Sequence, residues 1–439
     1  MALLEVKDLR VHFKIHDGWV KAVDGVSFSI DSGQTMGLVG ESGCGKTTAA
    51  YAITQLLPPN GHIKGGHIFY KEPEKVAAYR REYEARFEAS QEAVSRQIAD
   101  ATKALAELVA RGKGGATKAE EEKLHAKLDK LEASRLSGIR KAHDKELRRV
   151  RAQAGAGGPD AGDAKLRLAA LENRHDLLSL SIRKDGTLDD YNEDIRKIRW
   201  TEISMIFQGA MNAFNPVFKV GDQIKEAIQL HEEVDDAAAE KRAKELFEFV
   251  GINPDRIGNY PHEFSGGMKQ RAMIALALAL SPSFIIADEP TTALDVITQD
   301  RILVEIKKLQ QEWNMAMMII THDVSVVAEV SDMIGVMYAG MMMELGGTPQ
   351  VFKNTAHPYT AGLLNSFPSI KGPKRRLASI PGFPPDLVNP PSGCPFHPRC
   401  QYAQERCRLE RPKGVEIEPG HTSFCHFAAE LWDRLRRGA

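Results

Sequence analysis

The stretch that decides the fold is GESGCGKT, residues 40–47, which lies between the apolar run TMGLV (35–39) and the helix-compatible run TAAYAITQLL (48–57). In a loop of this pattern between a strand and a helix, glycines allow backbone N–H groups to wrap the phosphates of a nucleotide. We expect Lys46 to reach the β- and γ-phosphates and the Thr47 hydroxyl to bind Mg²⁺. A glycine turn before an ordinary helix is the weaker interpretation. The candidate nucleotide-binding residues are Gly40, Ser42, Gly43, Cys44, Gly45, Lys46, Thr47 and Thr48.

Two carboxylates end a second apolar run, FIIADEP, residues 284–290. We expect Asp288 to face the magnesium ion and Glu289 to polarise an attacking water. Alone, the pair could be two solvated carboxylates at the end of a strand. Together with the phosphate loop, it indicates nucleotide hydrolysis.

A second anion-binding surface is predicted at FSGGMKQR, residues 264–271, which leads into an alanine-rich helix. Ser265, Gly266 and Gly267 would expose a hydroxyl and backbone N–H groups at the start of that helix. We do not expect one chain to use both phosphate surfaces on the same nucleotide.

These residues resemble one family, the ATP-binding subunits of ABC transporters. In that family the SGG signature of one subunit closes over the nucleotide on the phosphate loop of the other, so that two subunits sandwich two ATP molecules. The resemblance implies that Gln208 in MIFQ is the Q-loop glutamine and that His322 in IITHD is the switch histidine. FSGGM replaces the usual LSGGQ, so Met268 stands where the family has a polar side chain.

The resemblance also assigns roles to the candidate residues. It implies that ALD (293–295) is the D-loop and that Phe13 stacks on adenine, with Trp19 as a rival. The implied catalytic residues are Glu289, His322 and Gln208, and the implied magnesium ligands are Thr47, Gln208 and Asp288. The cofactors would be ATP and Mg²⁺.

The predicted fold class is α/β, because strand-like runs alternate with helical runs on both sides of a charged middle region. The resemblance implies a P-loop ABC ATPase with a RecA-like parallel sheet core, an antiparallel β subdomain and an α-helical signature subdomain. It covers about residues 1–72 and 190–439. The expected divisions are a first nucleotide-binding part (1–72), a charged helical or coiled-coil insertion (73–189), a second nucleotide-binding part (190–348) and a small Cys-rich C-terminal domain (349–439).

The middle region differs from the rest in charge, since about 39% of residues 71–190 are charged against about 22% elsewhere. Its composition favours helix. We expect helices near 74–110 and 117–153, separated by RGKGG, and a shorter helix near 164–182. Either a solvated helical hairpin or a docking surface fits this pattern. Leu124, Leu128, Leu131 and Leu136 would give the second helix an apolar stripe.

HPYTAGLL (357–364) and MIFQGAMNAFNPVFKVGDQI (205–224) resemble segments of the dipeptide, oligopeptide and nickel branch of these importers. The resemblance implies an ATPase subunit that energises the uptake of di- or oligopeptides. The implied partners are a second ABC ATPase subunit, a paralogue rather than a copy, two integral membrane permease subunits and an extracytoplasmic solute-binding protein. Import of nickel chelates or oligosaccharides is the alternative within the family.

A different class, an SMC-like or soluble ABC ATPase without membrane partners, would also carry helices within a nucleotide domain. Lys plus Arg number 58 against 59 Asp plus Glu. This balance argues against binding nucleic acid by bulk charge. The longest apolar run, Ala272 to Leu280, is shorter than the roughly 20 residues of a membrane-spanning helix. The opening MALLEVKDLRVHF has no apolar signal core. These features indicate the cytosol, and the resemblance to importer ATPases implies a peripheral position on the cytoplasmic face of the cell membrane.

Four cysteines crowd the C-terminal region with the spacing C-x5-C-x6-C-x17-C. In a reducing compartment such a cluster suggests metal ligation more than disulfides. The resemblance implies a 4Fe-4S cluster held by Cys394, Cys400, Cys407 and Cys425, while zinc and plain thiols stay open. We expect any such cluster to be structural, because nothing nearby in the sequence suggests a redox substrate. Cys44 is either a small tolerated side chain or a redox-sensitive thiol.

Overall fold

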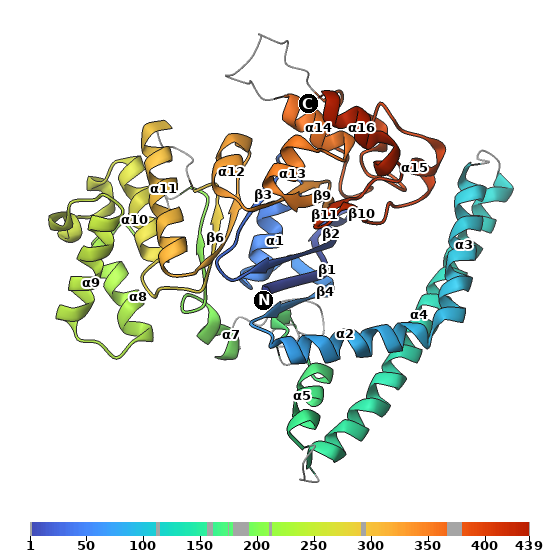
Figure 1. The fold of residues 1–439 in the computed structure, drawn as a ribbon, viewed down its shortest axis with the longest axis horizontal. Coiled ribbons are helices and arrows are strands. Elements are labelled where there is room, and N and C mark those ends of the chain that lie inside the picture. The colour runs from blue at the N-terminus through green and yellow to red at the C-terminus, as the bar shows by residue number, and fades with distance from the viewer. Residues whose placement is uncertain are drawn as a thin grey trace.

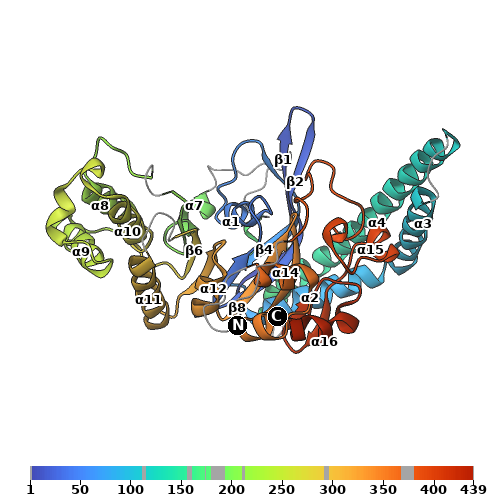
Figure 2. The ribbon, with the colours of Figure 1, turned by 90° about the horizontal axis from the view of Figure 1, so that it is seen from above.

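The computed structural model describes residues 2–110, 115–155, 161–173, 175–178, 193–209, 213–290, 296–366 and 380–438. Within these ranges the strands form two sheets, with helices between them and around them (Figure 1). A group of short helices and a pair of long helices project from opposite ends of the molecule, as Figures 1 and 2 both show.

The smaller sheet is antiparallel and has the order β2-β1-β4. In β1, Leu4 and Val6 point into the core at a spacing of two, and the pairing then shifts before Leu9 and Val11 continue on the same face. Asp8, with φ of 46°, occupies the shift, so one extra residue keeps the apolar side chains on the buried side. The strands are β1 (Ala2–Ile15), β2 (Gly18–Asp31) and β4 (Gly61–Tyr70).

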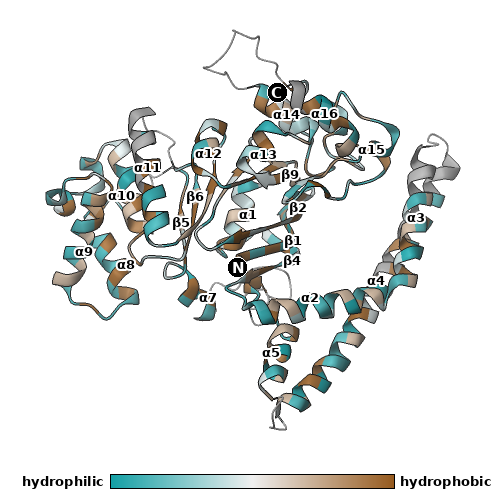
Figure 3. Cartoon of the chain, in the orientation of Figure 1, coloured by the Kyte–Doolittle hydropathy of each residue, from teal (hydrophilic) through white to brown (hydrophobic). Residues whose placement is uncertain are grey.

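The larger sheet has the order β10-β11-β9-β8-β3-β7-β6-β5, in which neighbours from β8 to β5 are parallel. Every residue of β3, β6 and β7 is buried, as expected for parallel strands that are covered on both faces. Figure 3 shows the resulting hydrophobic strands. The strands are β3 (Thr35–Val39), β5 (Ile203–Ile206), β6 (Phe284–Asp288), β7 (Ala316–Ile320), β8 (Met333–Tyr338), β9 (Met341–Gly347), β10 (Val415–Glu418) and β11 (His421–Ser423).

Each face of the parallel sheet belongs to a different apolar core. Ile286 of β6 packs in the cluster that also contains β1 and the buried face of α1, whereas the adjacent Ile285 packs in the cluster of the short-helix group. This alternation follows from the two-residue period of a strand. The structure thus contains both the parallel sheet core and the antiparallel sheet that were expected. The helices beside the sheet are α1 (Lys46–Ile53), α7 (Glu193–Ile198), α11 (Val296–Glu312), α12 (Val324–Val330) and α13 (Thr348–Lys353).

The group of short helices carries the predicted signature. Its core includes Phe247 and Phe264, whose rings meet edge to face with centroids 6.1 Å apart. We call this group the helical lobe. It consists of α8 (Val220–His231), α9 (Asp236–Phe249), α10 (Gly266–Ala277) and the 3-10 turns η2 (Pro254–Gly258) and η3 (Pro261–Glu263).

The helices between β4 and β5 largely follow the sequence expectation. The expected helix near 74–110 is divided at Ser90, whose hydroxyl donates a hydrogen bond to the Phe87 carbonyl at 2.6 Å. The expected helix near 117–153 spans residues 115–155. The helix expected near 164–182 is described for residues 161–171, and residues 179–182 lie outside the described ranges. The helices are α2 (Glu74–Ala89), α3 (Glu92–Ala110), α4 (Gly115–Gly155) and α5 (Ala161–Leu171).

The coiled-coil expectation for this insertion finds no support. Leu124, Leu128 and Leu131 are only half-buried, whereas a coiled coil needs a buried seam of such residues. The side chain of Leu136 lies outside the described part. The insertion instead has a small core of its own, formed by Tyr83, Phe87, Val150 and Leu171 of α2, α4 and α5.

A separate Cys-rich C-terminal domain is likewise not supported. The hairpin of β10 and β11 extends the main sheet, because Thr422 and Ser423 pair with Leu345 and Glu344 of β9. Cys394, Phe396 and Cys407 also share one apolar cluster with Val39 of β3. The remaining helices are α14 (Pro358–Asn365), η4 (His397–Arg399), α15 (Glu405–Leu409) and α16 (Ala428–Gly438).

None of the helices in the described ranges is both long and apolar enough to cross a lipid bilayer.

Candidate functional site

The carboxyl ends of four parallel strands bring the predicted site residues to one edge of the main sheet. The phosphate loop follows β3, Gln208 follows β5, the two carboxylates end β6, and His322 follows β7. Because β5, β6, β7 and β3 are consecutive neighbours in the sheet, segments far apart in the chain converge there.

The phosphate loop has the backbone geometry that its glycines were predicted to allow. Gly40, Gly43 and Gly45 have φ of 154°, 77° and 103°. A Cβ atom on Gly45 would lie 2.1 Å from the Ala22 carbonyl oxygen, and one on Gly40 would lie 2.2 Å from that of Met337. Any side chain at these two positions would therefore force the backbone apart.

Lys46 begins α1 and is buried at 8% exposure. Its Nζ donates hydrogen bonds to the carbonyl oxygens of Gly40 at 2.8 Å and Glu41 at 3.0 Å. The ammonium group thus lies within the loop, where it can exchange these acceptors for phosphate oxygens. No side chain caps the start of α1, so its first N–H groups are available to an anion.

Asp288 is suited to hold a cation. It is 1% exposed, and its Oδ2 has no hydrogen-bond partner among the residues that the structure describes. Burial raises the pKa of Asp288, and a hydrogen bond with Thr47 opposes this rise. A buried carboxylate oxygen without a partner is costly unless a cation or donor reaches it, so Thr47 and Asp288 fit a magnesium site.

Glu289 lies between the other two predicted catalytic residues. Its Oε2 accepts a hydrogen bond from Gln208 Nε2 at 2.6 Å, and its Oε1 is 3.1 Å from His322 Nδ1. Glu289 has φ of 47°, and its N–H donates to the Ile320 carbonyl of β7 at 2.8 Å. A non-glycine residue in this backbone region is commonly found at functional sites.

The signature residues lie at the start of α10 in the helical lobe. Ser265 caps this helix by accepting a hydrogen bond from the Met268 N–H at 3.3 Å. In Figures 1 and 2, α10 is well separated from α1 and the phosphate loop. Gly266 and Gly267 are half-buried, and the Met268 side chain packs against the core of the lobe. The two predicted phosphate-binding surfaces of one chain are thus kept apart.

The two aromatic candidates for adenine have different surroundings. Phe13 is half-buried against the first apolar core, beside Gly61. Trp19 meets His62 edge to face, and Lys64 Nζ lies 3.7 Å from the centroid of its ring. Because Lys64 occupies one face of the Trp19 ring, we favour Phe13 as the residue that would stack on adenine. The proposed D-loop (293–295) lies outside the described residues.

The HPYT segment has a structural role that its sequence did not reveal. His357 caps α14 by accepting a hydrogen bond from the Tyr359 N–H at 3.0 Å, and complete burial lowers its pKa to about 3. The Tyr359 hydroxyl accepts a hydrogen bond from the N–H of Glu41, a residue of the phosphate loop, at 3.0 Å. Sequence reasoning did not single out Glu41, because the partners of its N–H and its carboxylate lie more than 300 positions away.

The four C-terminal cysteines line one small cavity, together with His397 and His426. Burial raises the pKa of the Cys394 thiol to about 12 and that of Cys425 to about 11. Within the described ranges, however, no group of three or more His, Cys, Asp or Glu side chains is arranged to hold a metal ion. The iron–sulfur expectation is therefore not supported by this arrangement, although the thiol donors are of a type that fits a soft metal.

Fold and site together define an ATP-hydrolysing cassette of the ABC class. Comparison with known families agrees, since the ABC transporter family model matches residues 23–153 and 176–292, more than half of the chain. A second model, the oligopeptide/dipeptide transporter C-terminal region, matches residues 343–407. The chain belongs to the family of ATP-binding subunits of oligopeptide and dipeptide ABC transporters.

Named relatives match over nearly the whole chain. The oligopeptide transport ATP-binding protein OppD of Haemophilus influenzae is 34% identical to this chain. The alignment covers 98% of this chain and 99% of OppD. The dipeptide transport ATP-binding protein DppD of Caldanaerobacter subterraneus is 32% identical, with 98% of each chain covered. OppD of Escherichia coli is 34% identical over 97% of this chain and 93% of its own length.

Proposed function

We propose that this chain binds and hydrolyses ATP to energise the import of di- or oligopeptides across the cytoplasmic membrane. The observation that carries the proposal is the position of Glu289, whose carboxylate is held between Gln208 and His322 beside the buried Asp288. The solute class rests on the named relatives and on the match of the C-terminal region.

Each residue has a proposed task in hydrolysis. Lys46 and the N–H groups of the loop bind the phosphates, and Thr47 and Asp288 hold Mg²⁺, with Gln208 as a further ligand. The ion would neutralise charge on the β- and γ-phosphates. Glu289 accepts a hydrogen bond from the attacking water and directs it in line with the bond that breaks, while His322 orients the γ-phosphate.

The assembly would supply the missing parts of each ATP site. Phe13 would stack on the adenine of the nucleotide bound here, and the signature of a second ATPase subunit would close over that nucleotide. Ser265, Gly266 and Gly267 of this chain would close in turn over the nucleotide on the second subunit. We expect that subunit to be a paralogue, joined to two integral membrane permeases, with an extracytoplasmic protein that delivers the solute. Nucleic acid has no part in this scheme.

The experiment that tests the proposal is transport by the assembled importer in proteoliposomes. ATP hydrolysis and uptake should both rise when di- or oligopeptides are delivered by the binding protein, and both should be lost in Lys46→Ala. Stimulation by nickel chelates or oligosaccharides, and not by peptides, would show that the importer carries another solute of the family. A chain that purifies without permeases and hydrolyses ATP unchanged by solute would favour a soluble or SMC-like ATPase.

We also propose that the C-terminal cysteines can hold a 4Fe-4S cluster with a structural role. The family resemblance and the shared cavity support it. Protein purified without oxygen should contain about four irons per chain and acid-labile sulfide, with the matching absorbance spectrum. Zinc alone, or neither metal, would contradict the cluster and leave the ATPase proposal standing. No step of hydrolysis passes through this group.

A further inference from the structure

Arg399, in the cysteine-bearing segment, forms an ion pair with Glu41 in the phosphate loop. Its Nη1 and Nη2 donate to Oε2 and Oε1 of Glu41 at 2.7 Å and 3.1 Å. The Arg399 side chain is 7% exposed and that of Glu41 is 24% exposed. A two-point contact of this kind is directional and is shielded from solvent more than a surface pair.

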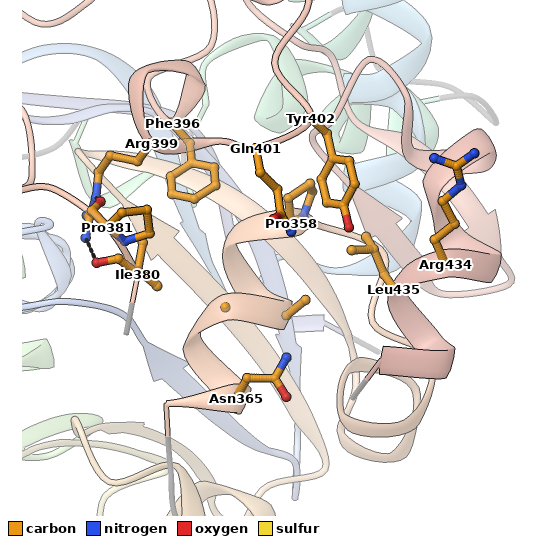
Figure 4. Close-up of a pocket in the computed structure, with 12 residues that line it drawn as sticks. Pro358, Asn365, Ile380, Pro381, Phe396, Arg399, Gln401, Tyr402, Arg434 and Leu435 are labelled. Carbon is orange, nitrogen blue, oxygen red and sulfur yellow. Dashed lines mark hydrogen bonds between the residues drawn. The ribbon is translucent and has the colours of Figure 1, made fainter. Parts of the chain in front are cut away.

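The remaining donors of Arg399 are also engaged, so its position is fixed. Nε donates to the Pro381 carbonyl at 2.8 Å, and Nη2 also approaches the Ile380 carbonyl at 3.4 Å. Figure 4 shows the guanidinium turned toward these two residues at one end of a cavity of about 290 Å³. Nη1 further donates to the Tyr338 hydroxyl at 3.3 Å.

Glu41 is held from a second direction by the HPYT segment. Its N–H donates to the Tyr359 hydroxyl, and the Tyr359 ring packs against Tyr338 and Phe396 with centroids 4.7 Å and 5.2 Å away. The backbone and the side chain of Glu41 are thus both bound to residues of the C-terminal half. This fixes the first turn of the phosphate loop.

The contact bears on the nucleotide in two ways. The carbonyl of Glu41 accepts a hydrogen bond from Lys46 Nζ, so a shift of Glu41 would displace the lysine that binds phosphate. The Glu41 carboxylate would also repel a triphosphate if it were not neutralised, because like charges a few ångströms apart interact strongly away from bulk water.

We propose that Arg399 is a positioning residue of the ATP site, through which the segment between Cys394 and Cys400 supports nucleotide affinity. Arg399 acts through Glu41 and touches no reacting atom. The inference rests on the proposed ATP site. It goes further by making nucleotide binding depend on the structure of the C-terminal segment, which lies outside the nucleotide motifs.

The test compares nucleotide affinity in the full-length chain, measured by calorimetry with a non-hydrolysable ATP analogue. Arg399→Gln should weaken binding about tenfold, equivalent to about 1.4 kcal/mol. Arg399→Lys should fall between Arg399→Gln and the unchanged chain, because lysine keeps the charge but not the two-point geometry. In the importer, Arg399→Gln should raise the KM for ATP and leave kcat within about twofold.

The decisive variant is Glu41→Gln combined with Arg399→Gln. If Arg399 acts through Glu41, the double variant should lose less affinity than the sum of the losses in Arg399→Gln and Glu41→Gln measured separately. A loss equal to that sum would overturn the proposal, since Arg399 would then act only by supporting its own segment. Unchanged affinity in Arg399→Gln would overturn it as well.

Two controls separate this inference from the ATP site itself. Arg406, which lies in α15 between Cys400 and Cys407, forms an exposed pair with Glu410, so Arg406→Gln should leave affinity unchanged. Lys46→Ala should abolish tight binding. If Lys46→Ala loses affinity while Arg399→Gln keeps it, the ATP site stands and the role of Arg399 is wrong. If neither variant changes affinity, both proposals are wrong.

Discussion

At the residue scale, the site depends on a few side chains whose environments differ sharply. Asp288 and Glu289 are adjacent, yet Asp288 is buried, with one oxygen that no described residue contacts by a hydrogen bond, and Glu289 faces Gln208 and His322. Asp288 is the last residue of β6, and Glu289 follows it with a left-handed backbone, beyond the regular strand. Two neighbouring acids can therefore serve the metal and the water separately.

Glu289→Gln should bind ATP as tightly as the unchanged chain and lose about 100-fold or more in turnover, since glutamine cannot accept the proton of the attacking water. Nucleotide binding and phosphate release by the purified importer would measure the two effects. Gln208 can still hydrogen-bond to the new side chain, so the local structure should persist. Normal phosphate release would contradict the role of Glu289 as base.

His357 gives a prediction for the pH dependence of stability. Its pKa is about 3 in the folded chain, below the ordinary value near 6.5, so between these values the unfolded chain binds a proton that the folded chain does not. The free energy of unfolding should therefore fall as the pH falls through this window, by up to about 1.4 kcal/mol per pH unit from this group.

Comparison with His357→Asn isolates that contribution. Asparagine can also cap a helix but does not titrate, so the dependence on pH should become flatter in the variant. Denaturant unfolding between pH 7 and pH 4 would measure both proteins. Equal slopes would show that the imidazole does not control acid stability.

At the element scale, one buried arginine fixes the charged insertion to the antiparallel sheet. Arg80 of α2 is 3% exposed and pairs with Glu72 at 2.8 Å and with Glu5 of β1 at 2.6 Å. Its guanidinium also lies 3.6 Å from the centroid of the Phe69 ring of β4. The helices were predictable from composition, but this attachment was not, because Glu5 is distant in the chain.

Arg80→Met should destabilise the chain by about 3–5 kcal/mol, because it leaves the buried carboxylate of Glu72 and the partly exposed one of Glu5 without their cation. Arg81→Gln on the same helix removes an exposed pair with Glu74 and should change stability by less than about 1 kcal/mol. Denaturant unfolding measures the loss, and limited proteolysis should show earlier cleavage within α2 to α5. Equal stability of the two variants would contradict the role of Arg80.

At the scale of the whole molecule, the two phosphate-binding surfaces lie in separate parts of one chain. The phosphate loop is at the centre, next to the C-terminal region, and the signature is in the helical lobe at one end (Figure 1). In the proposed function a signature from another subunit completes the ATP site, so we expect hydrolysis to depend on assembly.

Gly267→Asp should spare ATP binding to the phosphate loop and reduce hydrolysis by the assembled importer at least tenfold, because it places a negative charge on the surface that meets phosphate. Lys241→Gln, on the exposed face of α9 in the same lobe, is the control and should hydrolyse ATP normally. Binding and phosphate release would be measured in parallel. Full hydrolysis by Gly267→Asp would contradict the signature assignment.

The amino-acid sequence by itself determined the class of fold, the phosphate loop and the order of the motifs, since glycine conformations, strand patterns and helix propensities act over short stretches. The tertiary structure alone decided that the C-terminal region joins the main sheet and that Arg399 meets Glu41, which lies 358 residues earlier. Neither contact has a local signal, because each arises from packing between segments that only the folded sheet brings together.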